Sequence, residues 1–377
     1  MKHDQNTLNW LRLTRSENIG PITFNKLIEF YGDAGRALNA LPEMAKRGGR
    51  KKPLVAYPEK KAIDEIKALE KLGGRLLIKT DAEYPAHLTA CEDAPPVLAV
   101  LGNINLLSKQ GVGVVGGRNA SINGQKIAAK FAAHISEAGY PVISGLARGI
   151  DAAAHKASLQ HGTIAVVAGG IDVIYPEQNT DLYNEIIEYG AVVAESPIGT
   201  QPPKHFFPKR NRIIAGLSYG VTVIEAKRKS GSLITANMAL DYGRDVYAVP
   251  GSPLDPRSSG ANDLIKTQAA QLVTNPEDVI NDIQSSLKST FKDTDEPNRL
   301  SGLPKPMADA IKDTLEDNRA KCSTEVMNCL SATPIHIDEI IRETDYTPAI
   351  VQAILLEFEL GGVIQRHPGG LINLILE

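Results

Sequence analysis

Between residues 76 and 285 the sequence alternates short apolar segments with amphipathic ones, and this alternation constrains the fold more than any other feature. The apolar segments predict strands, and the last six of them are rich in β-branched residues, as in strands buried on both faces. Strict alternation of strands and helices predicts an α/β fold with a parallel, doubly wound sheet. The predicted strands are 76–78, 97–101, 112–115, 142–144, 164–167, 192–194, 221–224 and 246–249. The predicted helices are 124–138, 151–159, 182–189, 211–217 and 233–242.

The loops that follow the strands carry the candidate binding residues, because ligands of doubly wound sheets bind beyond the carboxyl ends of the strands. Glycine in such loops lets backbone amides approach an anion, and helix N-termini point at it. The candidates are Gly117, Arg118, Ser144, Gly145, Arg148, Ser230, Gly231, Ser232 and Thr235. Residues 204–229 hold seven Lys or Arg and one acidic residue, Glu225, although the whole chain has a formal net charge of −3. One edge of the sheet is therefore expected to be positive.

The stretch 206–218 concentrates charge and aromatic surface. Pro208 favours an extended entry, and Asn211 is a good N-cap, so a helix is predicted from 212 to 217. Cations at a helix start, beside the flat ring of Phe207, suit a polyanion that can also stack, and single-stranded nucleic acid fits this better than a small phosphate ester. A solvated basic loop over an ordinary helix is the alternative. The cations of this stretch are Lys209, Arg210 and Arg212.

Two familiar nucleotide-binding patterns are disfavoured by their context. Gly111, Gly113 and Gly116 match GxGxxG, but the dinucleotide fingerprint needs its glycines after the strand, and the first two lie before or inside it. No acidic residue ends the next strand to hold a ribose, and no GxxxxGK[ST] occurs, so an NAD-binding module and a P-loop ATPase are not expected. Asp151 and His155, four apart on one helix, are expected to be a structural pair. No other cluster predicts a catalytic residue, a metal site or a bound cofactor.

The cysteines and the apolar runs indicate the setting of the chain. Cys91, Cys322 and Cys329 form no CxxC pair and predict neither a disulfide framework nor a zinc site. No apolar run reaches transmembrane length, and the N-terminus lacks the apolar core of a signal peptide. The sequence predicts a cytoplasmic protein with no membrane partner.

Residues 1–75 are expected to form a small helical domain. Two apolar helical segments flank the turn at 18–24, which is typical of a helix-hairpin-helix whose turn amides hold a backbone phosphate. A helical interaction domain is an equal alternative. The segment holds fifteen Lys or Arg and nine Asp or Glu, net +6, and the run 46–52 supplies five of these cations. That run by itself indicates a solvated loop.

The C-terminal quarter predicts a linker followed by a winged helix. Residues 286–315 are polar and rich in Ser, Asp and Pro, which is typical of a linker. Three helical runs and a Gly-rich hairpin at 361–373 then predict a winged helix in residues 316–377. This segment holds four Lys or Arg and ten Asp or Glu, net −6, and its third helix has no cation. Because phosphate contacts dominate DNA affinity, a protein-contact or structural role is expected.

Read together, six segments of the middle domain resemble the DprA family of DNA-processing proteins, also called Smf, in the order that the family shows. The resemblance implies an extended Rossmann-like domain, with a helix-hairpin-helix or SAM-like domain before it and a winged helix after it. It further implies a protein that binds single-stranded DNA, forms a homodimer through the Rossmann-like domain, protects incoming DNA and loads the RecA recombinase in natural transformation. Single-strand-binding protein is a further expected partner. The segments are 115–128, 144–159, 163–183, 207–218, 221–251 and 260–265.

Position by position, the resemblance implies functional residues in the proposed DNA groove. Arg118 falls on the arginine of the family's GSR turn, Lys204 and Phe207 on the lysine and aromatic of the groove, and Arg210 and Arg212 on the RNR cations. Gly117 replaces the serine of that turn. Gln268 stands where the family usually has glycine, which leaves open how the preceding helix ends. The rival from the enzyme class is a Rossmann-like nucleotide-processing enzyme of the lysine-decarboxylase-like group, but its PGGxGT loop is replaced here by PGSP at 250–253.

Overall fold

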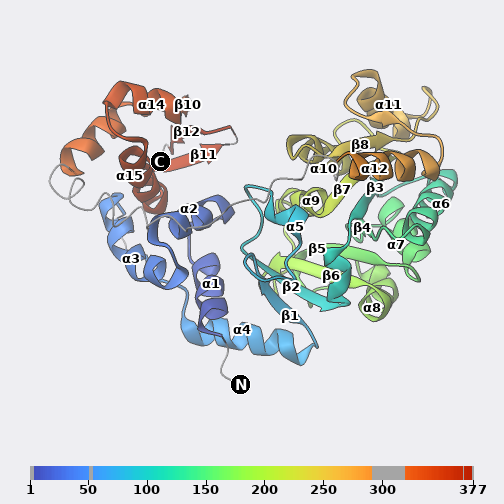
Figure 1. Ribbon diagram of the computed structural model, residues 1–377, viewed down its shortest axis with the longest axis horizontal. Helices are drawn as coiled ribbons and strands as arrows, with labels where there is room; N and C mark the ends of the chain where they lie inside the picture. Colours follow the sequence, from blue (N-terminus) through green and yellow to red (C-terminus); the bar gives the residue numbers. More distant parts are fainter. Residues whose placement is uncertain (1–3, 51–53, 291–318, 368, 376–377) are drawn as a thin grey trace. The chain divides into compact units, whose positions relative to one another are not determined.

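The computed structural model describes residues 4–50, 54–290, 319–367 and 369–375 (Figure 1). Its contacts divide the chain into two compact units, with a boundary after Asp64. The first combines the two ends of the chain, and the second contains the middle.

The middle unit is built on a nine-stranded sheet with the order β1-β2-β6-β5-β4-β3-β7-β8-β9. Strands β1 and β2 pair antiparallel, β2 and β6 pair antiparallel, and all pairs from β6 to β9 are parallel. All eight segments predicted as strands are strands, and the doubly wound α/β fold is confirmed. The strands are β1 (Arg75–Ile78), β2 (Val97–Gly102), β3 (Gly111–Gly116), β4 (Val142–Ser144), β5 (Thr163–Gly170), β6 (Ala191–Ser196), β7 (Ser218–Ile224), β8 (Asp245–Ala248) and β9 (Gln271–Leu272).

The strand order creates a switch point between β3 and β7. From β3 the chain proceeds through β4, β5 and β6 in one direction, and β7 then returns to pair with the free side of β3. Connections from β3 and β7 therefore leave the same edge in opposite directions, which opens a crevice beyond their carboxyl ends. The sheet topology places the binding edge there.

Helices cover both faces of this sheet because its strands alternate two sets of apolar side chains. Val115, Ile143 and Val221 face a core with α5, α9, α10 and α11. Val112, Val114 and their neighbours face α6, α7 and α12, and α8 closes the same face beside β5 and β6. The helices are α5 (Ala86–Thr89), α6 (Ile122–Glu137), α7 (Ile150–Ser158), α8 (Thr180–Tyr189), α9 (Phe206–Leu217), α10 (Gly231–Asp241), α11 (Ser259–Lys266) and α12 (Pro276–Thr290), with short 3-10 turns η1 (Ile104–Ser108), η2 (Glu177–Asn179) and η3 (Pro256–Ser258).

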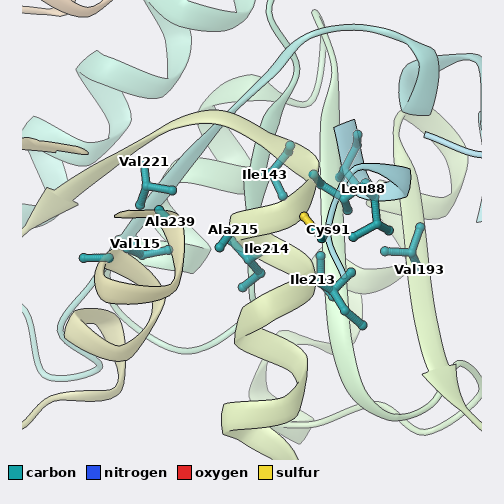
Figure 2. Packing of buried hydrophobic residues seen from close by; sticks show 14 of the residues in the cluster. Leu88, Cys91, Val115, Ile143, Val193, Ile213, Ile214, Ala215, Val221 and Ala239 are labelled. Atoms are coloured by element: carbon teal, nitrogen blue, oxygen red, sulfur yellow. The ribbon is translucent and has the colours of Figure 1, made fainter. Parts of the chain in front are cut away.

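Helix α9 starts earlier than the sequence predicts. It begins at Phe206, so the predicted extended entry at Pro208 and the predicted N-cap at Asn211 are both wrong. Pro208 lies in the first turn, where its missing N–H has no helical partner to lose. Asn211 is buried inside the helix, and its side-chain amide donates to the Gly231 carbonyl at 3.0 Å. Figure 2 shows Ile213, Ile214 and Ala215 of this helix in the buried core that fixes its position.

The N-terminal part of the other unit is helical, as predicted. Helices α1 (Gln5–Arg15) and α2 (Pro21–Tyr31) flank a turn in which Asn18 has a φ of 61°, and α3 (Ala34–Arg47) follows. The next helix, α4 (Glu59–Lys71), continues past the unit boundary at Asp64. Trp10 and Phe24 pack with ring centroids 4.7 Å apart. The basic run at 46–52 is only partly a loop, because its first two residues end α3. The run's last two residues lie outside the described ranges.

The C-terminal part of the same unit is a winged helix, which confirms the prediction. Residues 319–328 are helical and precede α14 (Ile337–Thr344) and α15 (Pro348–Gly361). Strands β10 (Ile335–His336), β11 (Ile364–His367) and β12 (Leu371–Leu374) form a three-stranded sheet in the order β10-β12-β11. Of the predicted linker, residues 286–290 belong to α12, and 291–315 lie outside the described ranges.

Helix α15 is the shared element of this unit. The glycine that caps α3, Gly48, touches the backbone of Glu357 and Gly361 so closely that no side chain fits there. Arg319 pairs with the buried Glu357 carboxylate at 3.2 Å, and Thr23 donates to Glu359 at 2.8 Å. The third helix of the winged helix is therefore packed against the N-terminal helices of its own chain.

Candidate nucleic-acid interface

Two adjoining cavities lie at the carboxyl edge of the parallel strands. The first has a volume of about 330 Å³ and the second of about 230 Å³. Both are lined by Arg118 of the β3–α6 connection, Ala147 of the β4–α7 connection, and Phe207 and Arg210 of α9. The first is completed by Gly145, Arg148, Tyr175, Pro176, Glu177 and Gln178. The second is completed by Val115, Gly116, Gly117, Asp151, Pro208, Asn211, Ile214, Ser230, Gly231, Ser232, Ile234 and Thr235.

Arg118 and Phe207 form the centre of this surface. The Arg118 guanidinium is exposed and lies over the Phe207 ring, 5.0 Å from its centroid. Phe207 is half-buried, and its ring also packs against that of Tyr175, with ring centroids 5.6 Å apart and planes inclined by 54°. Phe207 is therefore neither a core residue nor a fully solvated one. An accessible cation beside accessible rings is an arrangement that single-stranded nucleic acids bind.

Arg210 lies on the buried side of Phe207. It is only 6% exposed, and its guanidinium donates to the carbonyls of Gly145 and Val166 and lies 6.0 Å from the Phe207 centroid. Burial lowers the pKa of Arg210 to about 10, although the nearby Asp151 opposes that shift. The side chain therefore contributes a buried positive charge and fixes the position of the β4–α7 loop.

The β4–α7 loop is held by buried polar groups of α7. The Asp151 carboxylate accepts from the backbone N–H of Gly145 at 3.2 Å and of Ala147 at 3.3 Å. His155 accepts from the N–H of Leu146 at 3.3 Å, and its other ring nitrogen contacts the Thr163 hydroxyl at 2.7 Å. Burial raises the pKa of Asp151, whereas burial and the Arg210 charge lower the pKa of His155 to about 3. The expectation that Asp151 and His155 are structural agrees with these contacts, which leave Arg148 exposed at the loop's tip.

Glu225 fixes the turn that carries Arg118. Its carboxylate accepts from the backbone N–H of Ser121 at 2.7 Å and from the Ser121 hydroxyl, which in turn caps α6 through Gly124. Gly117 lies against the Glu225 carbonyl. The only acidic residue of the basic stretch is thus used to attach the β3–α6 turn to β7, and sequence reasoning missed this role.

The start of α10 faces the second cavity. Ser230 is its N-cap residue but makes no side-chain cap hydrogen bond; its hydroxyl instead contacts that of Ser232 at 2.8 Å. Gly231 is exposed, and Asn211 holds its carbonyl. The predicted helix N-terminus is therefore present, and Thr235 is buried one turn further on.

Some candidate residues lie elsewhere. Arg212 lines neither cavity and donates to the Asp93 carbonyl and to the Glu195 carboxylate, so it attaches α9 to neighbouring segments. Ser144 is fully buried and donates to the Val114 carbonyl. Lys204 and Lys209 are exposed beside the start of α9 but line neither cavity, and Lys209 lies 5.5 Å from the Phe206 ring centroid.

The sequence reasoning missed the contribution of the β5–α8 connection. Tyr175, Pro176, Glu177 and Gln178 all line the first cavity. The sequence contained a signal for this contribution, because the aromatic Tyr175 follows a predicted strand and the loops after the strands were already candidate binding loops. By contrast, all three glycines of the GxGxxG match lie within β3, whereas the dinucleotide fingerprint needs its glycines after the strand.

Within the described ranges no group of three or more His, Cys, Asp or Glu could hold a metal ion. Over the same residues no helix is both long and apolar enough to cross a membrane. The three cysteines carry free thiols.

Comparison with known proteins identifies the family. The model of the DNA recombination-mediator protein A family matches residues 75–284. The chain belongs to this family. Models of a DprA-like N-terminal HHH domain and of a DprA winged helix domain match residues 4–68 and 310–370. The family membership expected from the sequence motifs is thereby confirmed.

Individual relatives resemble the chain over most of its length. Protein Smf of Escherichia coli is 36% identical over 323 residues, which cover 85% of this chain and 83% of that one. The crystal structure of DNA processing protein A from Streptococcus pneumoniae has a TM-score of 0.62 at 39% identity and covers 74% of this chain and 98% of that one. A Helicobacter pylori DNA processing protein A, solved to explain its single-stranded DNA binding mode, has a TM-score of 0.53 at 27% identity, with 56% and 96% covered.

Proposed function

We propose that this protein binds single-stranded DNA along the carboxyl edge of its sheet and acts as a recombination mediator without catalysing a reaction itself. The observation that carries the proposal is the exposed Arg118 guanidinium over the Phe207 ring at the β3/β7 switch point. Backbone phosphates need accessible cations, and unpaired bases need accessible rings. The Helicobacter pylori relative, which binds single-stranded DNA, supports the same ligand class.

The DNA path proposed here uses residues from four connections. Arg118 and Arg148 supply exposed cations within the cavities, and Lys204 and Lys209 extend the positive surface along the start of α9. The N-terminus of α10 at Gly231 offers backbone amides to a further phosphate. Arg210 and Arg212 are left out as direct phosphate contacts because both are buried and bonded to protein atoms.

Fluorescence anisotropy with labelled oligo-dT tests this function. Two to four phosphate contacts predict a slope of about −1.4 to −2.8 for the logarithm of affinity against the logarithm of salt concentration. A duplex of equal length should bind more weakly because its bases are not free to stack. Calorimetric titration with mononucleotides distinguishes the nucleotide-processing alternative. Tight mononucleotide binding, or an oligo-dT affinity independent of salt, would refute the proposed DNA site.

The finer role proposed is that the protein protects incoming DNA and loads RecA onto it in natural transformation, as a homodimer. The support is membership of the recombination-mediator family, together with a DNA edge left open by the fold. RecA filament growth on DNA coated with single-strand-binding protein should accelerate when this protein is added. If the protein binds DNA but leaves the lag before filament growth unchanged, RecA loading is refuted while DNA binding stands. Sedimentation analysis tests the dimer.

A further inference from the structure

We propose that Tyr175 is a second stacking residue of the DNA surface and that two adjacent bases are unstacked from each other when they bind. This inference rests on the proposed function. Tyr175 comes from the β5–α8 connection, whereas Phe207 comes from α9, so the two rings are brought together only by the fold.

Tyr175 has the exposure that stacking requires. It is 49% exposed, although its ring already packs against that of Phe207. It lines the first cavity together with Arg118, Arg148 and Glu177, so a base on its ring would have its phosphates close to two exposed cations and one carboxylate. Aromatic rings flanked by cations are the recurring arrangement in proteins that bind single strands without strong sequence preference.

The angle between the two rings determines the shape of the bound strand. The ring planes of Tyr175 and Phe207 are inclined by 54°. Bases that stack on one another are nearly parallel, so two bases that each lie flat on one of these rings cannot remain stacked together. The strand must therefore turn between them. A duplex cannot adopt this arrangement without breaking its own stack, and the ring pair thus selects single strands.

A different role for Tyr175 is to hold Phe207 in place without touching DNA. The two roles differ in a double-mutant cycle, because a residue that acts only through Phe207 loses its effect once Phe207 is removed. Independent stacking predicts that the effects of Tyr175→Ala and Phe207→Ala on oligo-dT affinity multiply. Tyr175→Ala alone should weaken binding by about five- to one-hundred-fold and leave the salt slope unchanged.

The experiment measures oligo-dT affinity for the full chain, Tyr175→Ala, Tyr175→Phe, Phe207→Ala and the double variant. Tyr189→Ala is the matched control, because that tyrosine is 56% exposed but lies on α8 outside both cavities. Tyr175→Phe should bind as the unaltered protein does, since it keeps the ring. Thermal melts confirm that each variant is folded. The circular dichroism of a pair of adjacent 2-aminopurines in the oligonucleotide reports whether the two bases separate.

Each outcome has one meaning. Multiplying effects and loss of the 2-aminopurine coupling on binding support the inference. If Tyr175→Ala binds normally, if the double variant binds as Phe207→Ala does, or if the bases stay coupled, the inference is wrong although DNA binding stands. If the unaltered protein does not bind oligo-dT at all, the proposed function fails and the inference fails with it.

Discussion

At the scale of single residues, the proposed surface divides its contributions between charge and aromatic contact. Arg118 is a planar, permanently charged fork suited to phosphate, and Phe207 is a half-buried ring without charge. The fold places them 5.0 Å apart, so both act on the same part of a strand. Their contributions can nevertheless be separated, because salt weakens only the charged one.

Phe207→Ala should weaken oligo-dT binding by about 1–3 kcal/mol and leave the salt slope nearly unchanged, because it removes stacking but no charge. Arg118→Ala should weaken binding and also flatten the slope by about 0.7. Anisotropy titrations at several salt concentrations measure both quantities.

The controls for these variants are matched in type and exposure. Phe206→Ala removes the neighbouring ring, which lines neither cavity, and Arg75→Ala removes an exposed cation from β1. Both should bind as the unaltered protein does. If Phe207→Ala instead lowers the melting temperature strongly, the ring is structural, and lost binding reflects unfolding.

Gln268 shows how the departure from the family's glycine is accommodated. Helix α11 ends at Lys266, and Gln268 adopts a φ of 58°, the left-handed conformation that glycine takes most readily. An L-residue other than glycine is strained there by about 1–2 kcal/mol. The helix therefore ends as it would with glycine, at a cost in stability.

Gln268→Gly should stabilise the protein by about 1 kcal/mol and raise Tm by about 2–4 °C, because it relieves that strain. The adjacent Thr267→Gly is the control: its φ is −86°, so glycine there should lower stability. Calorimetry measures both. A fall in Tm for Gln268→Gly would mean that side-chain contacts outweigh the backbone strain.

At the scale of elements, α7 and α9 together shape the edge that the loops form. His155 of α7 is fully buried and neutral, and Arg210 of α9 passes beneath the loop that His155 holds. Protonation of His155 would place a second charge beside Arg210 and disrupt the bond from Leu146. The conformation of the loop that exposes Arg148 therefore depends on His155 being neutral.

Stability should decline as pH falls below about 6.5, with His155 contributing up to about 1.4 kcal/mol per pH unit. The pKa of His155 is about 3 in the folded protein and 6.5 in the unfolded chain, so the unfolded chain takes up the proton first. The raised pKa of Asp151 acts in the opposite direction at low pH, because there the folded state protonates first.

His155→Gln isolates the histidine, since the variant retains Asp151. It should be less stable than the unaltered protein at pH 7.5, and the difference should shrink toward pH 4. Urea unfolding at a series of pH values measures the difference. Parallel curves for the two proteins would show that His155 is not the titrating group.

The elements were largely predictable from sequence, and the reasons for the failures are physical. Buried parallel strands have an unmistakable apolar pattern, so all eight predicted strands were found. The start of α9 was misplaced because Pro208 and Asn211 can stand just before a helix as well as within its first turns. The packing of Ile213 and its neighbours decides between the two positions. Burial of Arg210 was not predictable, because its partners are backbone carbonyls 44 and 65 residues away.

At the scale of the whole molecule, charge is separated along the chain. The sequence gives net +6 for residues 1–75 and net −6 for residues 316–377. The structure places most of both ends in one unit, where Arg47 of the basic end lies 4.0 Å from the Glu357 carboxylate of the acidic end. Part of the basic N-terminal charge thus faces the acidic winged helix, which the sequence could not show because no local pattern joins residues 300 positions apart.

Removal of residues 299–377 should therefore disrupt the unit that the chain's ends form but leave DNA binding intact. Every residue of the proposed DNA surface lies in the middle unit, so oligo-dT affinity should stay within about twofold of the unaltered protein. The same deletion uncovers the side of α3 that packs on α15, so a dye that fluoresces on apolar surface should bind more strongly than it does to the full chain. Removal of residues 1–64 as well should reverse that increase. A loss of affinity as large as that caused by Arg118→Ala would place the winged helix in the DNA site after all.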